Sequence, residues 1–469
     1  MPGAGFFYPG ESEVRPGTYT RVESARPDEI NKGVTGVVLM PLFDWPYGPA
    51  KEFFTISARD RNAQMAKLGF NLFTTRPETL ALRECLENAR EVICYVPKSG
   101  TRAKAEGVDD GNGNVLNAEA KYGGVLGNEF RFTVVANPDE GYDVTVFVGT
   151  EAVEEFEGLT TVEELEKAGS QWITFSGSGD LTAVAGVTLS GATPPISTNL
   201  DVTKFLDAAE TVKWNTLYWP IDGYSYDEDG ELKKDPAKDA LMEAFVSKVR
   251  HLRDNCGKYI HAVCANYPAN DMGITNVVNG VYKGDVVIDE VTAAAWAAGL
   301  DSSSTKTQSN TARAYKGATA VYKPRTTDEI KAGIEAGEFQ FVLDDNNQIQ
   351  VEYDVNSLTD FSTTWLGAKV DKSYRKNRVI REYDALATRI QAEFPPNKFD
   401  NDEAGWTIME AIGTSILTEF QQDHALKDVD VETDFLVDRD ASKDDEVWFD
   451  VAAHAVESAE KLYFHIRTT

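Results

Sequence analysis

The order of apolar and polar positions predicts strands and helices that alternate along much of the chain. Short apolar runs, which are typical of buried strands, stand at 34–43, 91–97, 216–220, 258–265 and 274–282. Helical spacing lies between these runs, at 58–68, at 79–88, at 201–209 and in a helix that Asp235 caps. Because strands that alternate with helices form parallel sheets covered by helices, we expect a layered α/β core built from 34–97 and 199–345.

A different pattern interrupts this core at 98–198. The segment is rich in Gly, Thr and Val, and strand alternation runs through 130–135 and 142–148, followed by another strand at 173–177. We therefore expect a small, peripheral all-β domain that is inserted into the α/β unit.

The last third of the chain predicts helices followed by antiparallel strands. A helix at 327–336 leads into a hairpin with its turn at 344–347. Two long helices are then predicted at 374–394 and 403–424, and three strands at 429–437, 445–454 and 459–467. The fold class is thus mixed α/β and multi-domain, with a C-terminal domain of helices and antiparallel strands at 346–454 and an arm strand at 455–469.

The first 33 residues differ from a folded domain. Proline at positions 2, 9, 16 and 27 interrupts them too often for a helix or a long strand. The segment nevertheless keeps aromatic and apolar groups, and 18–24 alternate as an edge strand does, with Tyr19 and Val22 on opposite faces. We interpret 1–33 as an arm that docks on another structure.

Composition and charge narrow the classes of partner. The chain has 469 residues and a formal net charge of −30, from 76 acidic and 46 basic side chains. Such a field repels nucleic acid and anionic lipid, so direct nucleic-acid binding is not expected. No apolar run approaches the roughly 20 residues that cross a bilayer, and no secretory signal opens the chain. Four cysteines do not make a disulfide framework in so long a chain, so we expect synthesis in a reducing cytoplasm.

Candidate chemistry is sparse. His261 and Cys264 lie three apart on one predicted strand, with Cys256 nearby, which suggests a metal or thiol site. Strand alternation, however, sends His261 and Cys264 to opposite faces, and no second ligand pair has metal-binding spacing. No nucleophile elbow, phosphate-binding loop or zinc-protease motif is present. We expect neither an enzyme nor a cofactor.

One basic island stands out in this acidic chain, at the start of the helix predicted at 374–394. Its members are Lys372, Arg375, Lys376, Arg378 and Arg381. Cations are mildly unfavourable at a helix N-terminus, so a counter-charge is expected. The island either pairs with carboxylates of its own chain or contacts an acidic partner protein.

Five long segments, in matching order, resemble the tail sheath proteins of contractile phages, in the branch found in Gram-positive hosts and their prophages. They stand at 120–130, 172–192, 337–361, 376–390 and 456–466. The resemblance implies an α/β core, a peripheral β insertion and a C-terminal domain that faces an inner tube. A hydrolase on the α/β core and an adhesin-like module are alternatives from other classes; the first lacks a readable catalytic set, and only the β insertion supports the second.

The resemblance also implies a mechanism. Copies would join by strand exchange through their two arms, polymerise helically around the tail tube, and contract to drive that tube through the host envelope. The residues implied in the exchange are Thr18, Tyr19, Thr20, Arg21, Val22, Leu462, Tyr463, Phe464, His465 and Ile466. The partners implied are further copies of the chain, the inner tube protein, the baseplate and the tail terminator, and the basic island would face the tube or an acidic neighbour. A headless, bacteriocin-like or injection particle is the alternative to a phage virion.

Overall fold

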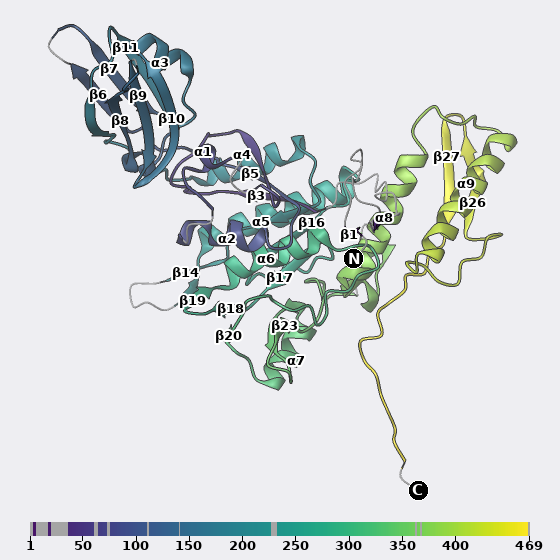
Figure 1. Cartoon of the computed structure of the whole chain (residues 1–469). Helices are drawn as coiled ribbons and strands as arrows, with labels where there is room; N and C mark the ends of the chain where they lie inside the picture. Colours follow the sequence, from purple (N-terminus) through teal and green to yellow (C-terminus); the bar gives the residue numbers. More distant parts are fainter. Residues whose placement is uncertain are drawn as a thin grey trace. The chain divides into compact units, whose positions relative to one another are not determined.

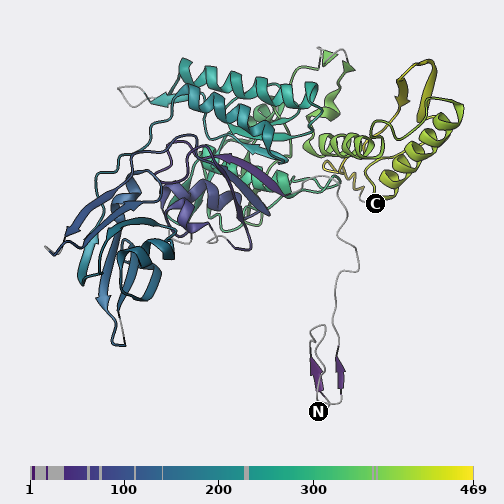
Figure 2. The same cartoon turned by 90° about the horizontal axis from the view of Figure 1, so that it is seen from above.

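The structure is a computed structural model, and it describes residues 3–5, 17–19, 36–60, 64–72, 76–109, 112–139, 141–226, 232–361, 364–365 and 368–467. The chain divides into two compact units, Met1–Gly33 and Val34–Thr469. In the first unit, strands Gly3–Gly5 (β1) and Gly17–Tyr19 (β2) pair in parallel, as Figure 2 shows. The arm strand predicted at 18–24 overlaps β2 at Thr18 and Tyr19, and the rest of that prediction lies outside the described residues.

A seven-stranded sheet forms the centre of the second unit (Figure 1). Its order is Glu338–Phe339 (β21), Ile274–Val277 (β17), His261–Ala265 (β16), Thr216–Tyr218 (β13), Val37–Pro41 (β3), Glu91–Tyr95 (β5) and Phe53–Ser57 (β4). All neighbours run parallel except the edge strand β4, which is antiparallel to β5. The parallel core predicted from the apolar runs is confirmed.

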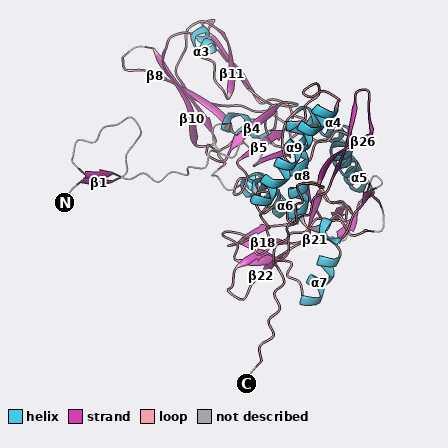
Figure 3. Ribbon diagram, turned by 90° about the vertical axis from the view of Figure 1, so that its right-hand side faces the viewer, coloured by secondary structure: helices cyan, strands magenta, loops and turns pink. Residues whose placement is uncertain are grey.

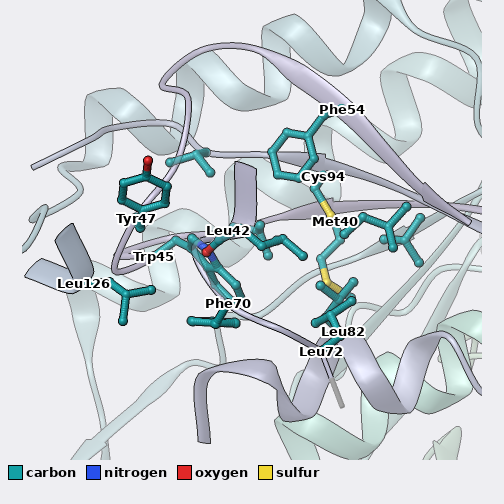
Figure 4. Packing of buried hydrophobic residues seen from close by; sticks show 14 of the residues in the cluster. Met40, Leu42, Trp45, Tyr47, Phe54, Phe70, Leu72, Leu82, Cys94 and Leu126 are labelled. Carbon is teal, nitrogen blue, oxygen red and sulfur yellow. The ribbon is translucent and has the colours of Figure 1, made fainter. Parts of the chain in front are cut away.

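Helices cover both faces of this sheet because its strands are apolar on both sides. On one face Val37 and Leu39 belong to a buried cluster with Phe205 of helix Asn199–Ala208 (α4) and Phe245 of helix Pro236–Arg250 (α5). The opposite face is covered by helices Leu80–Cys85 (α2) and Glu290–Ser303 (α6), which pack against each other. Met40, Leu82 and Cys94 meet on that side (Figure 4).

Helix α6 is absent from the sequence prediction, and its burial explains why. Its residues from Ala293 to Ser302 are buried on every side, so the helix has no polar face and no apolar stripe of helical period. Two other expectations are met only in part. Of the helix expected at 58–68, the described residues include the short helix Met65–Leu68 (α1), and residues 61–63 lie outside the described part of the chain. The run 274–282 forms β17 and Gly280–Lys283 (β18), which belong to different sheets.

The inserted domain is a pair of sheets that pack face to face. One sheet has the order Glu151–Leu159 (β10), Tyr142–Val148 (β9), Phe130–Ala136 (β8) and Val184–Thr188 (β12). The other has the order Ile173–Ser178 (β11), Val115–Ala120 (β7) and Lys104–Asp109 (β6), with helix Val162–Ala168 (α3) beside it. The rings of Phe132 and Phe175 meet between the sheets at 5.2 Å. Tyr47 of the core packs on Phe130 at 5.0 Å, which ties the insertion to the α/β unit (Figure 4 shows Tyr47).

Smaller elements complete the core. Strand β18 pairs with Val286–Ile288 (β19) and Ala320–Tyr322 (β20), and helix Thr327–Glu335 (α7) precedes the hairpin Phe341–Leu343 (β22) and Ile349–Val351 (β23). Two further strand pairs are Tyr224–Tyr226 (β14) with Leu232–Lys234 (β15), and Thr364–Trp365 (β24) with Ala368–Lys369 (β25). Single turns of 3-10 or π-helix stand at Pro77–Thr79 (η1), Val125–Glu129 (η2), Ala209–Thr211 (η3), His251–Asn255 (η4) and Lys372–Arg375 (η5).

The C-terminal part consists of two long helices and one hairpin. Helices Asn377–Glu393 (α8) and Glu403–Gln422 (α9) pack with strands Phe435–Lys443 (β26) and Glu446–Val451 (β27) around a separate apolar cluster. Gly413 lets the Phe435 ring lie against α9, because a Cβ there would lie 2.1 Å from that ring. The mixed α/β, multi-domain fold class with its β insertion is confirmed.

The third C-terminal strand expected at 459–467 is not formed. From Ala452 to Arg467 the structure has no helix and no paired strand beyond an isolated bridge at Ala455, and Figure 3 draws this segment as a loop. A strand needs a neighbour to satisfy its backbone N–H and C=O groups, and here no described part of the chain supplies one. The strand at 429–437 also begins later than expected, at Phe435, and continues to Lys443.

Candidate assembly surfaces

The basic island extends from η5 into the second turn of α8, and most of its charged groups pair with other parts of the chain. Arg381 is buried and donates to Asp301 Oδ1 and to Asp354 Oδ2, each at 2.8 Å. Arg378 donates to Glu382 Oε1 at 2.9 Å and to Ser458 Oγ at 2.6 Å. Pairing within the chain, one of the two readings left open by the sequence, describes both residues.

Of the remaining island residues, two bond to other parts of the chain and one is exposed. Lys376 pairs with Glu460, and Arg375 donates to the carbonyl oxygens of Leu358 at 3.1 Å and Glu335 at 2.7 Å. Lys372 is exposed. A buried, doubly paired guanidinium has no surface to offer another protein, so the expected contact with a tube or neighbour cannot use Arg381 in this conformation.

Arg381 belongs to a buried charge network that joins α8 to the α/β core. His261 on β16 lies between two carboxylates, 3.4 Å from Asp301 Oδ2 and 2.9 Å from Asp384 Oδ2. Arg253 makes a two-pronged contact with Asp384, with both N–O distances at 2.8 Å. Since Asp384 and Arg381 are on α8 and the others are on the core, this network fixes the helix on the sheet.

The electrostatics of the network follow from this pairing. Burial by itself would lower the pKa of His261, but the charges of Asp301 and Asp384 outweigh burial and raise that pKa to about 9. Burial would raise the pKa of Asp384, and the charges of Arg253 and His261 instead lower it. His261 is therefore a charged structural residue at neutral pH.

The suggested metal or thiol site is replaced by these contacts. His261 faces α6, whereas Cys264 lies in the apolar cluster on the opposite face of the sheet, as strand alternation predicts. Among the described residues no group of three or more His, Cys, Asp or Glu side chains could hold a metal ion.

A hollow of about 540 Å³ opens at the carboxyl ends of β3 and β13. This is the point where the strand order of the sheet reverses direction, the usual place of a ligand in open α/β sheets. Apolar side chains dominate its lining, its polar groups include Asp44, Glu78 and Lys238, and none of the described residues that line it is a histidine or a cysteine. Asp44 Oδ1 accepts from the backbone N–H of Ser197 at 2.6 Å, so this pair serves the loop structure. Ser197 and Thr198 bring hydroxyl groups to the hollow, and its described lining has no histidine to serve as their base.

The end of the C-terminal arm exposes four large apolar side chains in succession. The exposed fractions are 66% for Leu462, 90% for Tyr463, 82% for Phe464 and 85% for Ile466, and His465 between them is also exposed. In Figure 1 this segment runs to the C-terminus as a single extended thread. Such a run is unusual on a monomer and is typical of surfaces that another protein covers.

A second apolar surface lies on the β26–β27 hairpin. Phe435 and Phe449 face α9, while Leu436 and Trp448 project from the opposite face and are exposed. These two strands pair only with each other among the described strands. On β26, the backbone N–H of Val437 donates to Glu410 and its carbonyl accepts from Arg439, so side chains of the same chain cover that edge in part. Of the N-terminal exchange residues, Thr18 and Tyr19 are in β2, and Thr20, Arg21 and Val22 lie outside the described residues.

Sequence reasoning found the arm but missed the partners of the basic island. Asp301 is 80 positions from Arg381, and Asp384 is 123 positions from His261, and no local pattern links such residues. The apolar residue on the outer face of the hairpin could have been predicted from the sequence. Leu436 lies between the apolar Phe435 and Val437, so both faces of this strand carry apolar side chains.

The chain matches three protein-family models over most of its length. The model of the phage tail sheath protein beta-sandwich domain matches 98–193, that of the phage tail sheath protein central domain matches 197–357, and that of the phage tail sheath C-terminal domain matches 369–469.

Solved structures agree with the family models. The sheath tail protein of Desulfitobacterium hafniense is 30% identical, with a TM-score of 0.75, and the match covers 96% of this chain and 100% of that one. The sheath tail protein of Listeria innocua is 31% identical, with a TM-score of 0.71 over 92% of this chain and 94% of that one. The helical sheath of the anti-feeding prophage in its contracted state shares the fold, at 12% identity and a TM-score of 0.53, over 98% of this chain and 100% of that one.

Proposed function

The chain belongs to the family of phage tail sheath proteins, and we propose that its copies join by exchanging strands to form a contractile sheath around a tail tube. Proteins of this family are structural components of phage or phage-like particles, and the chain is not an enzyme. The proposal concerns how the copies join and what the assembly does.

The exposed end of the C-terminal arm carries this proposal. Leu462, Phe464 and Ile466 alternate with Tyr463 and His465, which is the pattern of a strand with one apolar face. In the single chain these groups face water, and no described residue pairs as a strand with the backbone of 461–467. Adding this segment to a sheet edge of another copy would pair the backbone and cover the apolar face together.

The β26–β27 hairpin of a neighbouring copy is a suitable receiver. Neither β26 nor β27 has a second neighbour among the described strands, and the exposed Leu436 and Trp448 offer apolar contacts to an added strand. The N-terminal segment 18–22 of another copy would complete the same joint. A joint between different surfaces forms a ring if its rotation closes and a helix if it does not, and the proposed sheath is the helical case, an array of stacked copies.

Contraction would then be a change in packing between rigid subunits. The strand links persist while the contacts between the cores of neighbouring copies change from one arrangement to another, and this change drives the enclosed tube outward.

A contractile sheath implies an inner tube, a baseplate and a terminator as partners, and synthesis in the bacterial cytoplasm before assembly. Of the basic island, Lys372 is the most exposed residue for a contact with the tube. A headless injection particle is the alternative to a phage, since both need the same sheath.

Removing the arm tests strand exchange. Deleting 462–469 should abolish the tubes that the purified chain forms on concentration, as measured by sedimentation and negative-stain electron microscopy. Phe464→Ser should raise the critical concentration for tubes about tenfold, because one buried aromatic group is lost from each joint. The matched control is Val135→Ser, which removes an exposed apolar group from β8 of the inserted domain. Tubes of normal width from the deleted chain would contradict the proposal.

A further inference from the structure

The C-terminal arm changes character at one residue, Glu460. Its side chain is 10% exposed, whereas every described residue from Lys461 to Arg467 is exposed. The arm therefore has a docked root at 455–460 and an exposed end at 461–467, of which Lys461 still lies over the Tyr353 ring at 5.7 Å. The two parts meet at a single buried carboxylate.

Three donors from two other segments hold this carboxylate. Glu460 Oε1 accepts from Ser309 Oγ at 2.7 Å and from Thr311 Oγ1 at 2.8 Å, both in the loop after α6. Its other oxygen pairs with Lys376 Nζ, which also lies 3.6 Å from the centre of the Tyr353 ring. A carboxylate is buried at low cost only when it is this well paired. Burial would raise the pKa of Glu460, and these donors instead lower it, which keeps the group ionised.

The rest of the root is attached to the helical part of the chain. Arg378 donates to Ser458 Oγ at 2.6 Å. The Val456 N–H donates to the Ala425 carbonyl at 2.9 Å, and Ala455 forms a strand-like bridge with Leu426 after α9. Two of the five island cations, Lys376 and Arg378, thus hold the arm.

The socket for Glu460 is itself fixed by the buried charge network. The Thr311 hydroxyl accepts from the Asp354 backbone N–H at 3.1 Å, and the Asp354 carboxylate accepts from the Asn310 N–H at 2.9 Å and from Arg381 at 2.8 Å. The donors are therefore held in place before the arm docks, which lowers the entropy cost of holding it.

We propose that this socket is an arm clamp, defined as Ser309, Thr311, Lys376 and Arg378 acting on Ser458 and Glu460, which sets the exit point and direction of the exchanged strand. The partner is a second copy of this chain, so the inference rests on the proposed strand exchange and deepens it. Leu462 is two residues beyond Glu460, within about 7 Å along an extended chain. A fixed root confines the strand to a small volume near its receiver, which raises its effective concentration there. Lys461 is then the hinge between subunit and link.

Loosening the clamp without touching the strand tests this inference. Lys376→Met and Ser309→Ala each remove one donor to Glu460, and Lys372→Met removes an exposed cation of the same island as a matched control. Thermal unfolding within a few degrees of the wild type confirms that each variant is folded. The first readout uses the unassembled chain: a Glu-specific protease should cleave after Glu460 about tenfold faster in the two clamp variants, relative to cleavage after the exposed Glu457.

The second readout is the critical concentration for tubes, which should rise about tenfold in both clamp variants and stay unchanged in the control. Wild-type protease protection or a wild-type critical concentration in Lys376→Met and Ser309→Ala would overturn the clamp. The arm deletion separates this failure from that of strand exchange: if the chain without 462–469 still forms tubes, the exchange is wrong, whereas if only the clamp variants assemble normally, the exchange stands and the clamp does not.

Discussion

Arg381, His261 and Asp384 show how single residues hold two parts of the subunit together. Each is ionised, buried and paired across the boundary between α8 and the α/β core. Removing one member of such a network leaves its partner charge buried without compensation, at a cost of about 3–5 kcal/mol. Charge reversal at Arg381 would therefore destabilise the fold. The exposed Lys372 is the better position for testing a contact with the tube.

Because of His261, the free energy of unfolding is expected to fall as the pH becomes alkaline. Its folded pKa of about 9 lies above the ordinary value of 6.5, so its contribution is complete below pH 6.5 and is lost as the pH rises through 9. We expect the free energy of unfolding to fall by up to about 3 kcal/mol between pH 6.5 and pH 9.5. Urea unfolding of wild type and His261→Gln should show this fall only in the wild type, with the exposed His251→Gln as control. Equal slopes in the wild type and His261→Gln would contradict this role.

At the scale of elements, the close packing of α2 on α6 determines how the core is built. Gly299 on α6 lies against the carbonyl of Cys85 at the end of α2, and a Cβ at that position would approach the oxygen to 2.3 Å. No side chain fits there without separation of the two helices. This contact explains a glycine inside a buried helix, where it otherwise lowers stability.

Gly299→Ala should therefore destabilise the subunit by about 1–3 kcal/mol, since the added methyl group overpacks the α2–α6 contact. In a helix without such a neighbour the same change stabilises by about 1 kcal/mol, so the sign of the effect is diagnostic. Chemical unfolding measures it, and Ser303→Ala at the exposed end of α6 is the control. A stabilised Gly299→Ala variant would show that the helices separate freely.

For the whole molecule, the net charge opposes association of the copies, whereas the proposed joint between copies favours it. Each copy carries a net charge of −30, so copies repel at long range, while the apolar arm attracts at short range. The clamp inferred above would favour assembly by presenting the arm in one direction.

Salt should consequently favour tube formation. Raising NaCl from 0.05 to 0.5 M shortens the screening length from about 14 to about 4 Å and should lower the critical concentration several-fold. Sedimentation across a salt series measures it, and sucrose of matched osmolarity is the control. Tubes that dissolve as salt rises would instead show that ion pairs dominate the joint.

The sequence alone determined the parallel core, the inserted β domain, the α8–α9 pair and the apolar arm. Each of these rests on a periodic pattern or a run of apolar residues, such as 37–41 or 462–466, which is local and can be read along the chain. The family resemblance added the proposal of a joint between copies.

Only the tertiary structure decided what the basic island contacts. Lys376, Arg378 and Arg381 lie close together in sequence, but their partners Glu460, Ser458 and Asp301 come from distant segments that folding brings together. The tertiary structure also revealed helix α6, which is buried on nearly every side and therefore shows no helical period in the sequence. It showed as well that the segment 459–467, which alternates like a strand, has no strand partner among the described residues of its own chain. Which residues pair depends on what surrounds them in the folded protein, and the order of residues along the chain does not show this.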